Sequence, residues 1–423
     1  MASELQWRRT GAPAASRTDD IWFFDAQRGW AVNANGHVLQ TTDGGDTWER
    51  RFAAAEGTYL RCIGFDGEQR GWVGTLSASQ RLLETRDGGA TWRLVANLPP
   101  QAPPAICGLS VVDGVVAYGS GTNFPHRPTG VIKTVDGGDT WTGIDMNEHA
   151  TLLVDILFTD AHRGWVVGGK ADVPNPTRDD VIPVVLFTDD GGATWANRLA
   201  GIQPPLPKGE WGWKIQFLSA DIGFVSLENF DDGAILKTVD GGRTWTRKAV
   251  SDPQGNANLE GIGFVDDQHG WTGGWGNRNF DGGFTSETHD GGETWADANH
   301  VGRFLNRFRF IREPELVGYA SGDIVYKYAK PVGPVPRSVQ PARAPPSPTR
   351  LPIRIPVDLA SDEGTRVDIW DRFGEHVASP RPEPAGEEIV WSGETASGAQ
   401  APPGIYIMRV ASDGDAESRT LYL

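Results

Sequence analysis

Short apolar runs of strand length recur along residues 1–330 and alternate with turns rich in glycine and aspartate. In four places a phenylalanine stands seven positions before a tryptophan that follows a glycine: Phe23 and Trp30, Phe65 and Trp72, Phe158 and Trp165, and Phe264 and Trp271. Three further dipeptides hold the place of Gly-Trp elsewhere: Ala117-Tyr118, Gly223-Phe224 and Gly318-Tyr319. This pattern predicts a pair of strands that is repeated seven times.

A turn motif, Thr-x-Asp-Gly-Gly-x-Thr-Trp, follows six of these strand pairs at intervals of 44 to 54 residues. We call this motif the box. Its paired glycines supply the positive φ values of a tight turn, and its aspartate can accept hydrogen bonds from nearby backbone N–H groups. β-rich runs flank each copy, so the box predicts a hairpin turn. Because the box aspartates recur in every copy, we assign them to turn structure; they are Asp43, Asp87, Asp136, Asp190, Asp240 and Asp290.

The box resembles the Asp-box, or BNR repeat, at all six positions. This resemblance implies a β-propeller with one box per blade, between the third and fourth strands. The dense Asp-Gly-Gly-x-Thr-Trp form, with Arg-Gly-Trp upstream, is most similar to the propellers of photosystem II assembly factors. Asp-boxes also occur in sialidases, sortilin-type receptors and xyloglucan-cleaving glycosidases, so the fold alone does not decide the function.

The seventh strand pair has no box after it. Residues 308–330 contain three predicted strands, and a fourth is missing there. Near the N-terminus, Gln6-Trp7-Arg8-Arg9 mimics Thr47-Trp48-Glu49-Arg50, the strand that follows a box. We therefore expect an all-β, seven-bladed propeller in residues 1–330, in which the N-terminal strand closes the last blade and removes exposed sheet edges.

Residues 331–350 are rich in proline and predict an extended linker. Period-two alternation in residues 351–423 predicts a small β-sandwich with strands at 357–359, 366–370, 388–391 and 404–410. The order Val-Asp-Ile-Trp-Asp-x-Phe-Gly, Val-Trp-Ser-Gly and Pro-Pro-Gly-Ile-Tyr resembles the Ig-like domain of flagellar hook-cap proteins and of type IX secretion sorting domains. That resemblance implies an extracytoplasmic bacterial protein.

The net charge of −16 argues against nucleic acid or an anionic membrane surface as a partner, because both require a basic patch. No apolar run is long enough to span a bilayer. The first residues are not followed by the apolar region of a signal peptide, which predicts either a cytoplasmic protein or a mature chain whose leader was removed. Cys62 and Cys107 are expected to be buried free thiols. We expect a monomer without a cofactor.

In a four-stranded blade, the box and the turn between the first two strands lie on one face, which we call the box face. The connections between the second and third strands and between blades lie on the other, the loop face. Most insertions fall on the loop face: 96–106, 120–130, 170–183, 201–212, 228–233, 251–259 and 273–284. Long loops on a rigid scaffold are where binding usually resides.

Three tryptophans, Trp211, Trp213 and Trp275, fall in or beside these long loops, near Arg278. Aromatic rings beside polar groups can stack on a sugar or anchor a peptide, so these four residues are candidate ligand-binding residues. The alternative interpretation is that the rings only cover the top of the core.

Charged residues near the starts of the first strands form a second candidate cluster. They are Asp20, Asp155, Lys214, Glu260 and Arg307. Facing inward, they would converge at one mouth of the central channel, where Lys214 and Arg307 could bind a polar ligand and Asp155, Glu260 and Asp20 could do acid/base work. The alternative is an ion-pair ring without a ligand.

The sequence does not match the enzymes that share the Asp-box. A sialidase needs an arginine triad, and only Arg61 and Arg307 are plausible channel arginines. A xyloglucanase needs two propellers, and this chain has one. The eight histidines are scattered in turns such as Ala161-His162-Arg163, which predicts no His-based metal site.

The leading hypothesis is a non-catalytic propeller that recognises a protein or a polymer such as a polysaccharide on its loop face, with the C-terminal sandwich as an anchor or spacer. The alternative is a hydrolase or lyase that acts on a carbohydrate or small polar substrate at the channel mouth. Substitution of Asp155 or Glu260 discriminates between them, because an enzyme would lose turnover with its fold intact.

Overall fold

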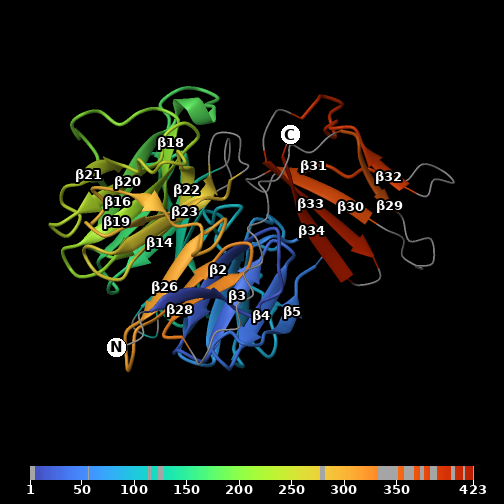
Figure 1. Cartoon of the computed structure of the whole chain (residues 1–423), viewed down its shortest axis with the longest axis horizontal. Helices are drawn as coiled ribbons and strands as arrows, with labels where there is room; N and C mark the ends of the chain where they lie inside the picture. The colour runs from blue at the N-terminus through green and yellow to red at the C-terminus, as the bar shows by residue number, and fades with distance from the viewer. Residues whose placement is uncertain are drawn as a thin grey trace.

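The computed structural model describes residues 5–55, 57–112, 114, 116–121, 128–276, 282–331, 351–356, 366–371, 376–381, 388–401, 405–412 and 415–422. Within these residues the structure is all-β, apart from one 3-10 turn, η1 (Arg178–Asp180) (Figure 1). The strands form repeated four-stranded antiparallel sheets. The predicted all-β class with a repeated sheet unit is therefore confirmed.

Six consecutive sheets each use four strands that follow one another in the chain. The first three sheets are β2 (Thr18–Phe23), β3 (Gly29–Asn33), β4 (His37–Thr41) and β5 (Glu49–Ala53); β6 (Leu60–Asp66), β7 (Arg70–Thr75), β8 (Leu82–Thr85) and β9 (Arg93–Leu94); and β10 (Gly108–Val112), β11 (Val116–Gly121), β12 (Gly130–Thr134) and β13 (Thr142–Asp145). The next three are β14 (Leu152–Phe158), β15 (Gly164–Lys170), β16 (Ile182–Thr188) and β17 (Ala196–Asn197); β18 (Glu210–Phe217), β19 (Gly223–Asn229), β20 (Ala234–Thr238) and β21 (Thr246–Ala249); and β22 (Ala257–Phe264), β23 (Gly270–Gly276), β24 (Thr285–Thr288) and β25 (Ala296–Asp297).

A further sheet, which we call the seventh, combines the two ends of this region. Its strands are β26 (Arg307–Ile311), β27 (Val317–Ser321), β28 (Val325–Ala329) and β1 (Gln6–Arg9). β1 pairs antiparallel with β28, and Trp7 lies opposite Tyr328. The Trp7 ring packs edge-on against Trp271 at 5.4 Å and Phe308 at 5.8 Å between centroids. The N-terminal strand thus contributes apolar surface as well as backbone pairing to this sheet.

Each box forms the same hydrogen-bonded turn. In the first box, Thr47 donates its backbone N–H to Asp43 Oδ1 at 2.9 Å and its hydroxyl to Asp43 Oδ2 at 2.6 Å. Gly45 N–H donates to Thr41 Oγ1 at 2.8 Å, and the two glycines have φ of 72° and 90°. These bonds to the charged carboxylate, first of all that from the Thr47 hydroxyl, lower the pKa of Asp43 to about 2.

Acid should weaken the boxes. The aspartates of five boxes have a pKa of about 2, well below the usual 3.9 or so of an unfolded chain. Their ionised form therefore stabilises the fold above about pH 4, and this contribution is lost as the pH falls towards 2. We expect the melting temperature of Asp190→Ala to fall less between pH 5 and pH 3 than that of the parent chain. Equal slopes in thermal melts would contradict this role for the box carboxylate.

Aromatic rings join neighbouring sheets. The aromatic residue of a second strand stacks on the first-strand phenylalanine of the next sheet, as Tyr118 does on Phe158 at 3.5 Å between ring centroids. The same contact joins the seventh sheet to the first, where Tyr319 stacks on Phe23 at 3.6 Å. One packing rule therefore operates both along the chain and between its first and seventh sheets.

Cations make a second repeated contact between neighbouring sheets, on the box face. In the described residues, five lysines or arginines donate to the carbonyl of the first box glycine of the next sheet. The pairs are Arg70 and Gly137, Lys133 and Gly191, Arg163 and Gly241, Lys237 and Gly291, and Lys327 and Gly44. Where the second strand carries tryptophan, the cation stands two residues before that tryptophan. Where the second strand carries phenylalanine or tyrosine, the cation lies on the third strand.

The described C-terminal residues form two further sheets. One pairs β29 (Ile353–Pro356) with β32 (Glu388–Trp391), and the other has the order β31 (His376–Ala378), β30 (Arg366–Asp371), β33 (Ile405–Ser412) and β34 (Asp415–Tyr422). Both contribute to one buried cluster that includes Val367, Ile389, Trp391 and Met408. The predicted strand at 357–359 and residues 332–350 of the predicted linker lie outside the described residues.

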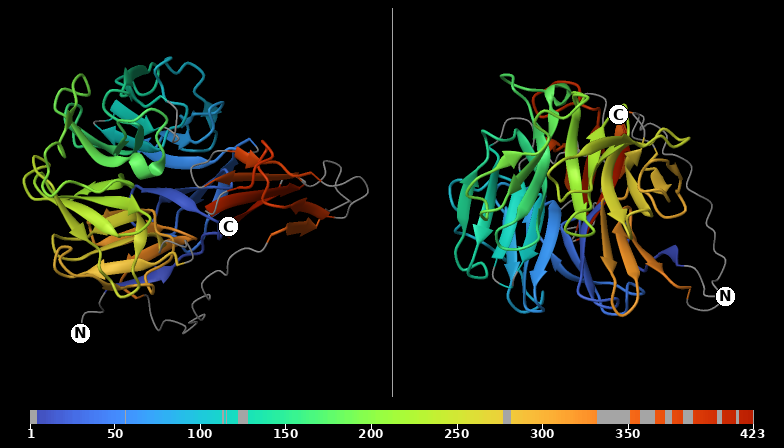
Figure 2. Two further views of the ribbon diagram at one scale, coloured as in Figure 1. Left: turned by 90° about the horizontal axis from the view of Figure 1, so that it is seen from above. Right: turned by 90° about the vertical axis from the view of Figure 1, so that its left-hand side faces the viewer.

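The C-terminal sheets contact the loop face. Ile407 on β33 is 1 % exposed and lies in a buried cluster with Ala34, Tyr59, Leu76, Ala105 and Cys107. These five residues belong to loop-face connections of the first three sheets and to the segments that lead into their first strands. Figures 1 and 2 show β33 beside this end of the first sheets. Cys62 and Cys107 are both buried thiols that form no disulfide, as predicted.

Candidate functional site

The first strands bring distant charged residues together in the middle of the molecule. Arg307 on β26 donates from Nε to Asp20 Oδ1 at 3.0 Å. Its two terminal nitrogens donate to the carboxylate of Asp155, at 2.9 and 2.7 Å. Asp20, Asp155 and Arg307 are 0 %, 1 % and 6 % exposed. The structure thus brings these three predicted residues together from the first, fourth and seventh sheets.

β-bulges set the direction of these side chains. The pairing of the first with the second strand shifts register between Thr18 and Asp20, and the same happens around Arg61, Val154, Lys214 and Glu260 in four other sheets. A bulge inserts one unpaired residue and re-aims its neighbours. Because the shift recurs at equivalent places, charged side chains from several sheets face the same central space.

A second ion-pair network lies beside the first. Arg17 donates from Nε to Asp19 Oδ1 at 2.6 Å and from a terminal nitrogen to Glu260 Oε2 at 2.7 Å. Arg61 also donates to Asp19 Oδ1. Asn306 Nδ2 donates to Glu260 Oε2 at 3.0 Å. All five residues are at most 5 % exposed, so this network is buried like the first.

Sequence reasoning missed Arg17 and Asp19. Arg17 immediately precedes β2, and Asp19 stands at its bulge, the place that Glu260 holds in the sixth sheet. The available signal was the dense polar run Arg17-Thr18-Asp19-Asp20 at the start of a strand that is otherwise apolar. A run of this kind at a strand start is unusual, because buried charges are retained mainly when they are paired.

The candidate tryptophans are part of the core. Trp211, Trp213 and Trp275 are 1 %, 3 % and 2 % exposed. They lie within β18 and β23, because these strands extend beyond the predicted loop boundaries. An exposed stacking platform at these rings was therefore a wrong prediction, and the alternative that they cover the core holds. Arg278 lies outside the described residues.

Two of these rings also hold the ion-pair network. Trp275 Nε1 donates to Glu260 Oε1 at 3.0 Å, and the Arg17 guanidinium lies 5.0 Å from the Trp275 ring centroid. The Arg61 guanidinium lies 4.9 Å from the Trp213 ring centroid. Cation–π contacts of this kind stabilise a desolvated cation. Trp213 and Trp275 thus position charges in the interior.

Lys214 has a different environment. Burial first of all, and then the neighbouring Arg307, lowers the pKa of its ammonium to about 8, although Asp155 and Asp20 oppose the change. The side chain is 1 % exposed, and its Nζ donates no hydrogen bond to any described residue. Lys214 therefore balances the local charge without forming a direct ion pair.

The predicted catalytic carboxylates are all engaged. Asp20 and Asp155 bind Arg307, and Glu260 binds Arg17, Trp275 and Asn306. Burial opposes ionisation of Asp155, but Arg307 and Lys214 outweigh it and hold the pKa of the carboxyl below its usual range. A carboxylate that stays ionised and is bound on both oxygens is a poor proton donor. The enzyme alternative is not favoured.

The family model described as photosynthesis system II assembly factor YCF48 matches residues 1–117. Photosystem II assembly lipoprotein Ycf48 of Synechococcus sp. is 25 % identical over 298 residues, which span 63 % of this chain and 85 % of that protein. Photosystem II stability/assembly factor HCF136 of Cyanidioschyzon merolae is 25 % identical over 324 residues, which span 63 % and 72 %. The chain is thus similar to photosystem II assembly factors.

Solved structures agree with this fold. The structure titled "YCF48 bound to D1 peptide" superposes with a TM-score of 0.55 at 18 % identity and covers 78 % of this chain and 99 % of that one. YCF48 from Cyanidioschyzon merolae superposes with the same TM-score at 19 % identity and covers 76 % and 98 %. At 10 % identity, a virginiamycin B lyase from Staphylococcus aureus gives 0.54. An assembly-factor-like propeller therefore shares its scaffold with an enzyme, and the residues of the site have to decide the function.

The described part of the chain holds no helix that combines the length and the apolar character of a membrane span.

Proposed function

We propose that this chain is a non-catalytic binding and assembly factor: a seven-bladed propeller that recognises a protein partner on its loop face. The observation that carries the proposal is the engagement of every candidate catalytic carboxylate in buried ion pairs. To take part in a reaction, these carboxylates would first have to leave their ion pairs, and breaking a buried ion pair is costly. The charges serve to hold sheets from around the ring in place.

The strand pairing supports the proposed count of seven blades and the proposed closure by the N-terminal strand. Seven four-stranded sheets occur among the described residues of 5–329, and β1 supplies the fourth strand of the seventh. The Phe23–Tyr319 stacking and the Lys327–Gly44 hydrogen bond support contact between the seventh and first blades. A closed ring leaves no free edge to pair with other chains, and a rigid ring suits a platform for binding.

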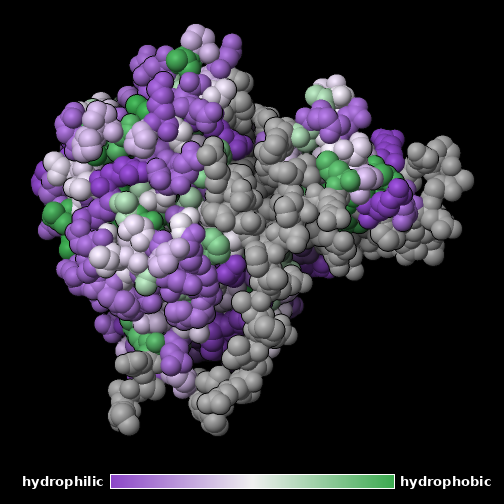
Figure 3. Space-filling model, turned by 45° about the horizontal axis from the view of Figure 1, so that its top comes forward, coloured by the Kyte–Doolittle hydropathy of each residue, from purple (hydrophilic) through white to green (hydrophobic). Residues whose placement is uncertain are grey.

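A protein partner fits better than a polysaccharide. The rings expected to stack on sugar are buried, and one structural neighbour is titled as bound to a D1 peptide. Figure 3, with the face that carries η1 turned forward, shows a mainly hydrophilic surface over which apolar residues are scattered. β33 already packs on the loop face of the first three blades. We therefore place the partner on the loop face of the fourth to seventh blades.

We propose further that residues 351–423 form an Ig-like sandwich, which a linker at residues 331–350 joins to the propeller. Two sheets that share one core support this assignment. The sandwich acts as an anchor or spacer for the propeller. We place the protein outside the cytoplasm, since a relative of the propeller is named a lipoprotein and the sandwich pattern resembles bacterial extracytoplasmic domains.

Site-specific photo-cross-linking in the source cells tests this function. A photo-reactive residue at Asp172 or Lys208, both exposed on the loop face of the fourth and fifth blades, should cross-link to one defined protein. The matched controls are Val135 and Val239, which are 61 % and 66 % exposed at one equivalent box position on the opposite face. Equal cross-linking from both faces, or none from the loop face, would refute the proposed binding surface.

A further inference from the structure

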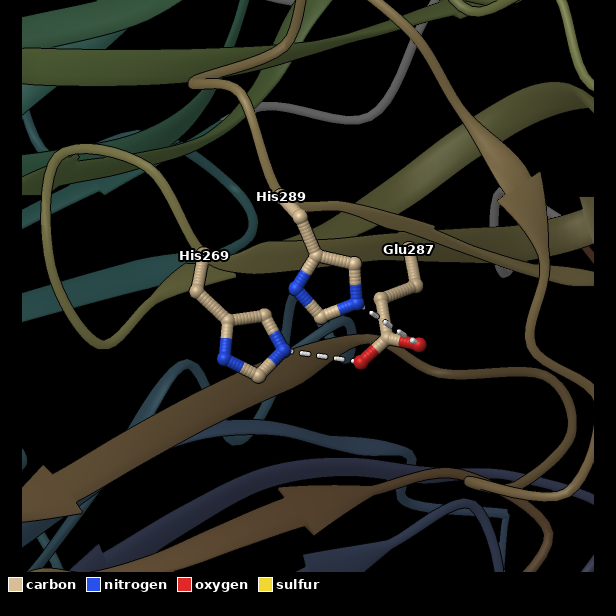
Figure 4. A group of neighbouring side chains, drawn as sticks. All are labelled: His269, Glu287 and His289. Atoms are coloured by element: carbon tan, nitrogen blue, oxygen red, sulfur yellow. Dashed lines mark hydrogen bonds and ion pairs between the residues drawn. The ribbon is translucent and has the colours of Figure 1, made fainter.

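Two histidines and a glutamate meet on the box face of the sixth sheet. His269 lies in the turn before β23, Glu287 on β24 and His289 in the box (Figure 4). His269 Nε2 lies 2.8 Å from Glu287 Oε1, and His289 Nε2 lies 3.7 Å from Glu287 Oε2. One potential ligand atom from each residue lies within 4.8 Å of the others.

Cross-strand register explains this meeting. Trp271 lies opposite Glu287, and Gly270 lies opposite Thr288. The residues that flank these pairs, His269 and His289, therefore lie next to each other, with their rings 4.3 Å apart between centroids. Neighbouring positions on paired strands are separated in the sequence, so the scattered histidines of the sequence gave no sign of the cluster.

The repeated architecture gives these residues no bridging role. In five other sheets, an arginine two residues before the second-strand tryptophan or a lysine on the third strand bridges to the box glycine of the next sheet. In the first sheet, Arg28 at the place of His269 reaches Glu68 of the second sheet. The seventh sheet has no box, so the sixth has no box carbonyl to reach. His269 therefore stands at the place of the bridging arginine in the one sheet whose next sheet offers no box carbonyl to accept the hydrogen bond.

The second sheet provides an internal comparison. Arg70, Glu84 and Arg86 occupy the places of His269, Glu287 and His289, as the equivalent pairing of Trp72 with Glu84 shows. There Arg86 forms an ion pair with Glu84 at 3.2 Å. An arginine cannot ligate a cation, whereas a neutral imidazole can. Only in the sixth sheet, among the described residues, do the three places hold potential metal ligands.

The donor set suits a divalent transition-metal ion. Two imidazoles and a carboxylate are ligands that Zn²⁺ commonly takes, with bond lengths of about 2.0–2.2 Å. In a tetrahedral site, bonds of this length place the ligand atoms about 3.3 Å from one another. Small rotations of the three side chains bring their ligand atoms from the present separations to this distance. The Trp271 Nε1–H donates to Glu287 Oε1 at 2.9 Å and orients the carboxylate, as outer-shell donors do in metal sites.

We propose that His269, Glu287 and His289 bind one divalent transition-metal ion of the Zn²⁺ type. The His289 side chain is 69 % exposed, and those of His269 and Glu287 are 23 % and 19 % exposed, so the ion enters directly from solvent and keeps water in its remaining position. The ion ties the turn between β22 and β23 to the box.

Titration calorimetry with zinc chloride on the full chain, free of any affinity tag, tests this site. We expect one Zn²⁺ per chain with a dissociation constant in the micromolar range. His289→Ala and Glu287→Gln should each weaken binding at least tenfold. His162→Ala is the matched control, because His162 is an exposed histidine in the corresponding turn of the fourth sheet, and it should leave the affinity unchanged.

His289 lies at an exposed turn position, so its alanine variant should keep the melting temperature of the metal-free protein. Cobalt should give the visible absorption of a nitrogen- and oxygen-ligated site in the parent chain and lose it in His289→Ala. Absence of saturable Zn²⁺ binding would overturn the proposal. Equal losses from His289→Ala and His162→Ala would also overturn it, since that result indicates non-specific binding by surface histidines.

Discussion

Arg307→Met is expected to destabilise the propeller by about 3–5 kcal/mol, the usual cost of leaving the partners of a buried ion pair uncompensated. Arg307 binds Asp20 and Asp155 with three hydrogen bonds, and the substitution leaves both carboxylates buried without it. Methionine keeps an unbranched apolar side chain at this position and removes only the guanidinium group. The loss should appear as a lower urea midpoint, followed by tryptophan fluorescence.

Arg28→Met is the matched control for Arg307. Arg28 also pairs with two carboxylates, Asp25 and Glu68, but its side chain is 44 % exposed. An exposed ion pair contributes about 0–1 kcal/mol, so the urea midpoint should hardly move. A loss of similar size in both variants would show that burial is not what makes the central network important. Unchanged stability of Arg307→Met would contradict the structural role of the channel charges.

Trp7→Ala is expected to destabilise the propeller by about 3 kcal/mol, at the lower end of the range for large-to-small core substitutions. Trp7 is the apolar residue of β1 that packs on Trp271, Phe308 and Tyr328. Without the ring, β1 keeps its backbone pairing with β28 but loses most of its packing. Frequent release of β1 should then expose the β28 edge, and the variant should aggregate at lower temperature.

The control for Trp7→Ala lies in the same strand. Arg9 pairs with Tyr326 but is 63 % exposed, so Arg9→Ala should change stability by no more than about 0.5 kcal/mol. Thermal unfolding with light scattering measures stability and aggregation together. If Trp7→Ala melts like Arg9→Ala, β1 does not close the ring.

Much of the fold follows from local chemistry that is visible in the sequence. The box encodes its own turn, because Thr41, Asp43, Gly45 and Thr47 hydrogen-bond to one another within a few residues. Similarly, Trp7 could be assigned to a fourth strand because its neighbours copy the strand after a box. Signals of this kind need no knowledge of distant contacts.

The candidate site was only partly predictable, because it depends on strand ends and register. Asp20, Asp155 and Arg307 were found because they hold similar places in the repeat. Trp211 and Trp275 were misplaced in loops, since the bulges near them let β18 and β23 run further than their apolar pattern suggests. The cluster of His269, Glu287 and His289 depends on the pairing of β23 with β24, which the sequence does not specify residue by residue.

The central claim is that the loop face of a closed propeller binds a protein while the channel charges remain structural. Cryo-electron microscopy of the complex that is captured through a photo-reactive residue at Lys208 tests it most directly. We predict a protein density on the loop connections of the fourth to seventh blades, with Arg307 still bound to Asp20 and Asp155. A partner on the box face, or a small molecule bound to Asp155 and Glu260 in the channel, would contradict the account.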